Sequence, residues 1–199
     1  MVALQLDEPM SLPTPSASFR TLFRRFRRSR RASAAVEFAI VAPLFFALLF
    51  AIIETALMFF ASQVMETITQ DSSRVIYTGQ AQNASLTQSQ FATCVCSRVP
   101  ALFDCSNIWI DVQNYPSFST VTINSPVDAA GNFVSQQFSP GGAADVVMVR
   151  LAYKWPIFVT GLGYNIANLP GSKRLLTASS AFRNEPYPGG TPATAGSCS

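Results

Sequence analysis

The sequence predicts an α+β protein, in which a long N-terminal transmembrane helix precedes an exported domain with a small antiparallel sheet. Three observations support this prediction. Seven of the 14 basic residues lie between Arg20 and Arg31, and the charge-free apolar run Phe38–Ile53 follows them. The second half of the chain holds several segments that alternate apolar and polar residues, without helical segments between them. A chain of 199 residues is long enough for one such domain and an anchor.

Residues 1–32 form a basic leader, and residues 33–61 form the expected transmembrane helix. The arginines predict a cytoplasmic amino terminus, because basic residues remain on the cytoplasmic side of a membrane. As a helix, Phe38–Ala61 extends about 36 Å at ~1.5 Å per residue, and a bilayer core is ~30 Å thick. Pro43 lies inside this segment and removes one backbone hydrogen bond, so we expect a bend or a loosened turn there.

Two glutamates interrupt the apolar segment. Glu37 stands at its start and is followed by Phe38, whereas Glu54 divides the run near its end. Ionisable groups within membranes usually face protein or water. Glu37 either pairs with a group of a neighbouring subunit or lies among the lipid headgroups, where the helix dipole favours it. Glu54 either faces a partner helix or marks the end of the membrane segment, and the sequence does not choose between these two.

Residues 62–185 form the predicted exported α+β domain, and residues 186–199, rich in Pro, Gly and Thr, form a flexible tail. The first helix continues as an amphipathic helix until Gly79, and a second helix lies within Leu86–Phe103 and is interrupted or terminated by Pro100. A polar connection is expected over Asn124–Gly142. The alternating segments predict three or four strands, at Ile108–Tyr115, Ser119–Ile123, Asp145–Phe158 and Lys173–Tyr187.

The chain has four cysteines and no histidine. The spacing of Cys94, Cys96, Cys105 and Cys198 does not fit zinc knuckles, so we expect no metal site, and in an exported domain an even count indicates disulfides. Either Cys94 or Cys96 can close a short loop with Cys105, and the other can reach Cys198; free thiols are the alternative.

Most biochemical classes other than a structural protein are disfavoured. From Ser33 onward the chain carries 7 basic and 9 acidic residues, so the domain lacks the basic face of a nucleic-acid-binding protein. Without histidine, a phosphate-binding loop or a dinucleotide-binding glycine pattern, we expect neither an enzyme nor a cofactor.

The segment Ala34–Glu54, AAVEFAIVAPLFFALLFAIIE, and the closing FRNEPY, Phe182–Tyr187, resemble the TadE-like family of Tad (Flp) pilus assembly proteins. The start of this segment is also similar to the signal of type IV pilin-like proteins. The resemblance implies a pilin-like domain and a prepilin peptidase cut between Ala32 and Ser33, which makes Glu37 the fifth mature residue. The family pattern has glycine before the cut, where this chain has Ala32.

The resemblance implies a minor pilin-like subunit, or pseudopilin, that acts in the assembly of a Tad-type pilus or secretion system. Its expected partners are other pilin-like subunits, the Tad assembly machinery, the prepilin peptidase and membrane lipid. It is expected in a bacterial inner membrane as a single-pass protein, with its C-terminal domain in the periplasm and with possible incorporation into a pilus. The alternative is an uncleaved, membrane-anchored periplasmic scaffold or ligand-binding domain.

Overall fold

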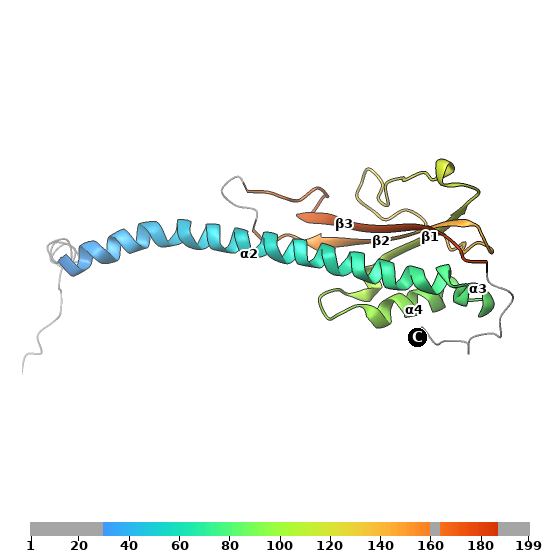
Figure 1. The fold of residues 1–199 in the computed structure, drawn as a ribbon. Helices are drawn as coiled ribbons and strands as arrows, with labels where there is room; N and C mark the ends of the chain where they lie inside the picture. The colour runs from blue at the N-terminus through green and yellow to red at the C-terminus, as the bar shows by residue number, and fades with distance from the viewer. Residues whose placement is uncertain (1–29, 160–163, 187–199) are drawn as a thin grey trace, which may run out of the picture. The chain divides into compact units, whose positions relative to one another are not determined.

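The computed structural model describes residues 30–159 and 164–186 of the chain, with side chains from Ala34 onward. The chain divides into two compact units, Met1–Phe46 and Ala47–Ser199, and the longest helix contributes to both. The elements, coloured along the chain in Figure 1, are α2 Arg30–Tyr77, α3 Gln80–Asn83, α4 Gln88–Arg98, the 3₁₀ turns η1 Cys105–Asn107 and η2 Phe118–Thr120, and strands β1 Trp109–Tyr115, β2 Val146–Pro156 and β3 Lys173–Arg183. The predicted α+β class is confirmed.

Local sequence signals explain where α2 ends and where α4 begins and ends. Gly79 adopts a left-handed conformation with φ of 76°, which glycine accepts at little cost, and its N–H donates to the Ile76 carbonyl. Helix α4 begins at a capping box, in which Thr87 and Gln90 each accept a hydrogen bond from the other's backbone. It ends before Pro100, within the predicted range.

The three strands form one antiparallel sheet in the order β1-β2-β3. The register places Val112 opposite Val149, and Val149 opposite Ser180. The strand predicted at Ser119–Ile123 is wrong, because this segment begins within η2 and then follows an irregular path. The Thr120 hydroxyl donates to the Ser117 carbonyl at 2.8 Å, a local bond that competes with strand pairing.

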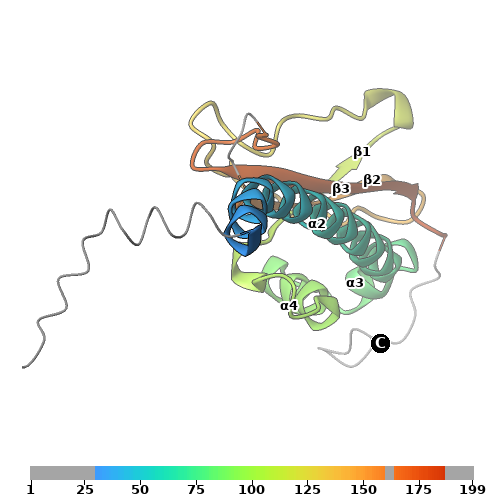
Figure 2. The same cartoon turned by 90° about the vertical axis from the view of Figure 1, so that its left-hand side faces the viewer.

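The core lies between the sheet and the C-terminal part of α2. This helix buries Met58, Ala61, Met65, Ile68 and Val75, which recur three, four or seven residues apart and so share one face. Figure 2 looks along the helix and shows the sheet on one side of it and α4 on the other. The amphipathic pattern predicted after Ser62 is therefore confirmed.

A buried ion pair fixes the long β1–β2 connection against the opposite face of the sheet. Asp111 of β1 and Arg150 of β2 lie in register, and their side chains are 2.7 Å apart. The Asp111 carboxylate also accepts the Gln137 N–H, and Arg150 donates to the Asn124 carbonyl. Because each charge has several partners, the ion pair stabilises the arrangement of the connection without leaving a charge unsatisfied.

Candidate anchoring and assembly segment

The first half of α2 exposes apolar side chains all round. Phe38 is 68% exposed, and within the described residues no side chain between Ala34 and Ile53 is buried. This helix is long and apolar enough to cross a membrane. A helix that is apolar on every face gains no stability from water and requires lipid or other helices around it. The finding fits a single-pass membrane anchor.

The predicted cleavage and assembly residues lie at the amino end of this helix. Ala32 and Ser33 belong to α2, although their side chains lie outside the described residues. Glu37 is exposed and lies one helical turn after Ser33, about 6 Å along the axis at ~1.5 Å per residue. The two positions therefore lie one turn apart on the same helix.

Pro43 does not end the helix, and α2 continues through it as far as Tyr77. The proline ring removes the N–H that would bond to the carbonyl four residues earlier. In a membrane, neighbouring groups must satisfy such a carbonyl. Pro43 therefore leaves this turn with one backbone hydrogen bond fewer but does not interrupt the helix.

Glu54 has surroundings different from those of Glu37. Its side chain is only 7% exposed, and its two carboxylate oxygens accept the backbone N–H groups of Phe158 and Val159, the latter at 3.0 Å. The partner of Glu54 is therefore the segment that follows β2 in the same chain. The sequence allowed either a partner helix or the end of the membrane segment for this residue, and only the folded structure identifies its partner.

A second contact joins the same parts of the chain. The Thr55 hydroxyl is hydrogen-bonded to the Tyr164 hydroxyl, and it also donates to the Ala51 carbonyl. Tyr164 and six residues of one face of α2 line a shallow groove of about 430 Å³, namely Leu48, Ala51, Ile52, Thr55, Ala56 and Phe59. The connection between β2 and β3 is thus attached to α2 at two consecutive residues, Glu54 and Thr55.

The cysteines form a covalent connection at the other side of α2. Cys96 of α4 is bonded to Cys105 of η1, with Cα atoms 5.6 Å apart. This is one of the two short-loop pairings that the sequence allowed. Cys94 is buried and also disulfide-bonded, whereas Cys198 lies outside the described residues. The bond holds the end of α4 next to the start of β1.

The closing motif, which begins at Phe182, packs on the end of α2. The sequence did not predict this contact. The Phe182 ring contacts Tyr77 edge to face at 5.9 Å, and the Glu185 N–H donates to the Tyr77 carbonyl. Asn184 is 2% exposed, and its amide nitrogen donates to the carbonyls of Pro140 and Gly142, both at 2.9 Å. The motif therefore attaches the end of β3 to both α2 and the β1–β2 connection.

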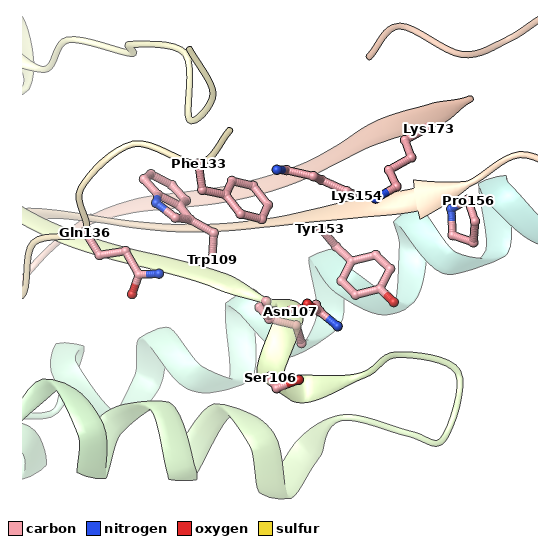
Figure 3. Close-up of a pocket in the computed structure, with 10 residues that line it drawn as sticks. Ser106, Asn107, Trp109, Phe133, Gln136, Tyr153, Lys154, Pro156 and Lys173 are labelled. Carbon is pink, nitrogen blue, oxygen red and sulfur yellow. The ribbon is translucent and has the colours of Figure 1, made fainter. Parts of the chain in front are cut away.

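A pocket of about 420 Å³ lies at the start of β1, beside the last residues of β2 (Figure 3). Trp109 stacks on Phe133, and the Lys154 ammonium lies 4.3 Å from the centre of the Phe133 ring. Lys173 and polar side chains such as Gln136 complete the lining. Among the described residues, no cluster of acidic or cysteine side chains suited to a metal is found. The lining combines two lysines with aromatic and polar side chains, and it contains no recognisable nucleophile–base pair.

Comparison with known proteins gives one result. Residues 32–74 match the TadE-like family. The match covers most of α2, including Glu37 and Glu54, and stops before the first strand. It confirms the resemblance over Ala34–Glu54, does not extend to Phe182–Tyr187, and supports a protein associated with the Tad pilus machinery in general. Neither the curated proteins nor the solved structures include a significant match.

Proposed function

We propose that the chain is a minor pilin-like subunit, or pseudopilin, that acts in the assembly of a Tad-type pilus or secretion system. The observation that carries this proposal is the division of α2. Its first half exposes apolar side chains on every face, whereas its second half packs on the sheet through residues such as Met65 and Ile68. The TadE-like match extends across both halves. Such a helix can pass from lipid into a bundle of similar helices while the domain stays folded.

In this proposal the arginine block keeps the leader in the cytoplasm, and the prepilin peptidase cuts between Ala32 and Ser33. The domain then lies in the periplasm and contacts other pilin-like subunits. Glu37 pairs with the amino group at Ser33 of a neighbouring subunit, which spares both charges from lipid. An unpaired carboxylate at the bilayer centre costs about 2.5–3.5 kcal/mol on insertion scales, and less near the interface. The role is structural and not enzymatic.

The test is the amino terminus of the mature protein, measured by mass spectrometry on membranes from cells with and without the peptidase. We expect Ser33 as the first residue only when the peptidase is present. Ala32→Gly restores the family's residue and is expected to increase the cleaved fraction. Retention of the Arg20–Arg31 block in both cell types would contradict the proposal.

A specific observation favours the alternative of an uncleaved membrane-anchored domain that binds a ligand. The pocket in Figure 3 combines stacked aromatic rings with Lys154 and Lys173, a composition suited to small polar ligands. The alternative predicts an intact leader and no incorporation into a fibre. The mass measurement above therefore separates the two functions.

A further inference from the structure

The end of the sheet beside Glu54 carries an exposed apolar surface. Phe158 is 82% exposed, and Phe59 and Phe60 of α2 are 62% and 59% exposed. Figure 1 shows β2 and β3 running alongside α2, with β2 ending near the middle of the helix. Because Glu54 binds the N–H of Phe158 itself, this phenylalanine is held next to the helix. We define Phe158, Val159 and Tyr164 as the rim.

We propose that the rim is a membrane-contact surface, on which the domain rests in the interfacial layer of the bilayer that α2 crosses. The inference rests on the anchoring role of α2 and not on cleavage or pilus assembly. Glu54 acts as a positioning residue, because its two hydrogen bonds to Phe158 and Val159 set the height of the rim on the helix.

The length of the apolar helix determines that height. Ala34–Ile53 is a run of exposed or partly exposed residues, and as a helix it extends about 30 Å at ~1.5 Å per residue, the thickness of a bilayer core. The far end of this apolar run is therefore at Ile53. This position is next to Glu54 and so level with Phe158. Phenylalanine at this level can insert among the acyl chain ends. Tyr164, bonded to Thr55, has the apolar ring and polar tip that favour membrane interfaces.

A basic residue near the rim agrees with this placement. Lys173 is exposed and lies opposite Pro156 in the sheet. Pro156 precedes Phe158 by two residues. At ~3.3 Å per residue along a strand, the backbone of Lys173 is about 7 Å from the rim, within reach of lipid phosphates. The apolar groove between Tyr164 and α2 adds space that an acyl chain can fill. A second copy of the chain is the competing occupant, but it would not require the rim to lie at the end of the anchor.

The experiment places a fluorescent probe on single cysteines in the full chain, reconstituted in phosphatidylcholine nanodiscs without reduction of the disulfides. The test site is Phe158→Cys. Ile52→Cys serves as the reference site at the far end of the anchor, and Phe118→Cys is the matched control. Phe118 is 57% exposed and lies beyond Tyr115, at the opposite end of the sheet. Lipids that carry a nitroxide quench probes that contact the bilayer, and the unsubstituted chain gives the background.

We expect nitroxide lipids to remove most of the fluorescence at Ile52→Cys and Phe158→Cys and little at Phe118→Cys. Adding Glu54→Ala is expected to reduce the quenching at Phe158→Cys and to leave that at Ile52→Cys unchanged. Quenching at Ile52→Cys with none at Phe158→Cys overturns the inference and leaves the anchor intact. Disulfide cross-linking of two chains through Phe158→Cys, without quenching, overturns it in favour of a second copy. Absence of quenching at both sites overturns the anchor as well.

Discussion

At the scale of single residues, the two glutamates of α2 differ in what surrounds them. Glu37 is exposed near the start of the helix, whereas Glu54 is buried and accepts two backbone N–H groups. The two hydrogen bonds are only partly buried, so water can reach these amides once the carboxylate is removed. Glu54→Ala is therefore expected to release the segment after β2, with faster hydrogen exchange at the amides of Phe158 and Val159.

Glu66→Ala is the matched control for this change, because Glu66 is exposed on the same helix. It should leave the exchange of both amides unchanged, and so should any change confined to the exposed face of α2. Equal exchange in Glu54→Ala and the unsubstituted chain would show that the two hydrogen bonds do not hold the segment.

Asn184 is a second residue whose role appears only in the fold. Its amide nitrogen binds two carbonyls of the β1–β2 connection, and its own N–H donates to the Asp145 carbonyl. Asn184→Ala removes the side-chain bonds inside a buried site, so we expect a loss of about 1–3 kcal/mol in the free energy of unfolding. Denaturant unfolding in detergent measures it. Gln70→Ala, at an exposed position of α2, should change the midpoint little.

At the scale of elements, the Cys96–Cys105 disulfide connects α4 to the start of β1. The two cysteines are nine positions apart along the sequence, and a disulfide that closes a loop of this size stabilises a protein by about 2–3 kcal/mol in the chain-entropy account. The double change to serine is expected to lower the unfolding midpoint without changing the denaturant slope greatly. An unchanged midpoint would indicate that packing of Phe91 and Val95 alone holds α4.

The turn before Phe133 depends on one carboxylate. Asp128 accepts the N–H groups of Asn132 at 2.8 Å and Ala130 at 2.9 Å, and the bond from Asn132 is the main cause that lowers the pKa of Asp128 below its usual range. Its stabilising contribution is therefore present above the unfolded-state pKa of ~3.9 and is lost as the pH falls through the lower folded-state pKa. We expect the NMR amide shifts of Ala130 and Asn132 to change in that acid range, and Asp128→Ala to remove the transition.

Elements with strong periodicity were predictable from sequence, and the contacts between them were not. The 3.6-residue pattern and Gly79 predicted α2 and its end, and alternation predicted β1, β2 and β3. The Ser119–Ile123 prediction failed because β-branched residues also occur in turns stabilised by Ser and Thr hydroxyls. The role of Glu54 depends on a partner about a hundred positions away along the chain, and that of Asn184 on a partner about forty positions away. No local pattern encodes such pairs.

At the scale of the whole molecule, anchoring and folding use different residues. The buried apolar residues among the described positions begin at Met58 and continue into β3, and Ala47–Ser199 is a compact unit by its own contacts. The candidate cleavage residues Ala32 and Ser33 and the candidate assembly residues Glu37 and Phe38 all precede that unit. Changes near Ser33 and Glu37 are therefore expected to affect processing and assembly without unfolding the domain.

A pair of truncated chains tests this separation. A chain that begins at Ala51 keeps Glu54, Met58 and Ala61, so we expect cooperative unfolding and protected amides in β2. A chain that begins at Gln63 lacks these three residues. Removal of a buried methionine side chain alone costs about 2–5 kcal/mol, so this chain should unfold at a clearly lower denaturant concentration in the same detergent. Similar midpoints for both chains would mean that the contacts around Glu54 add nothing to the stability of the domain, and that its fold begins only after the membrane segment.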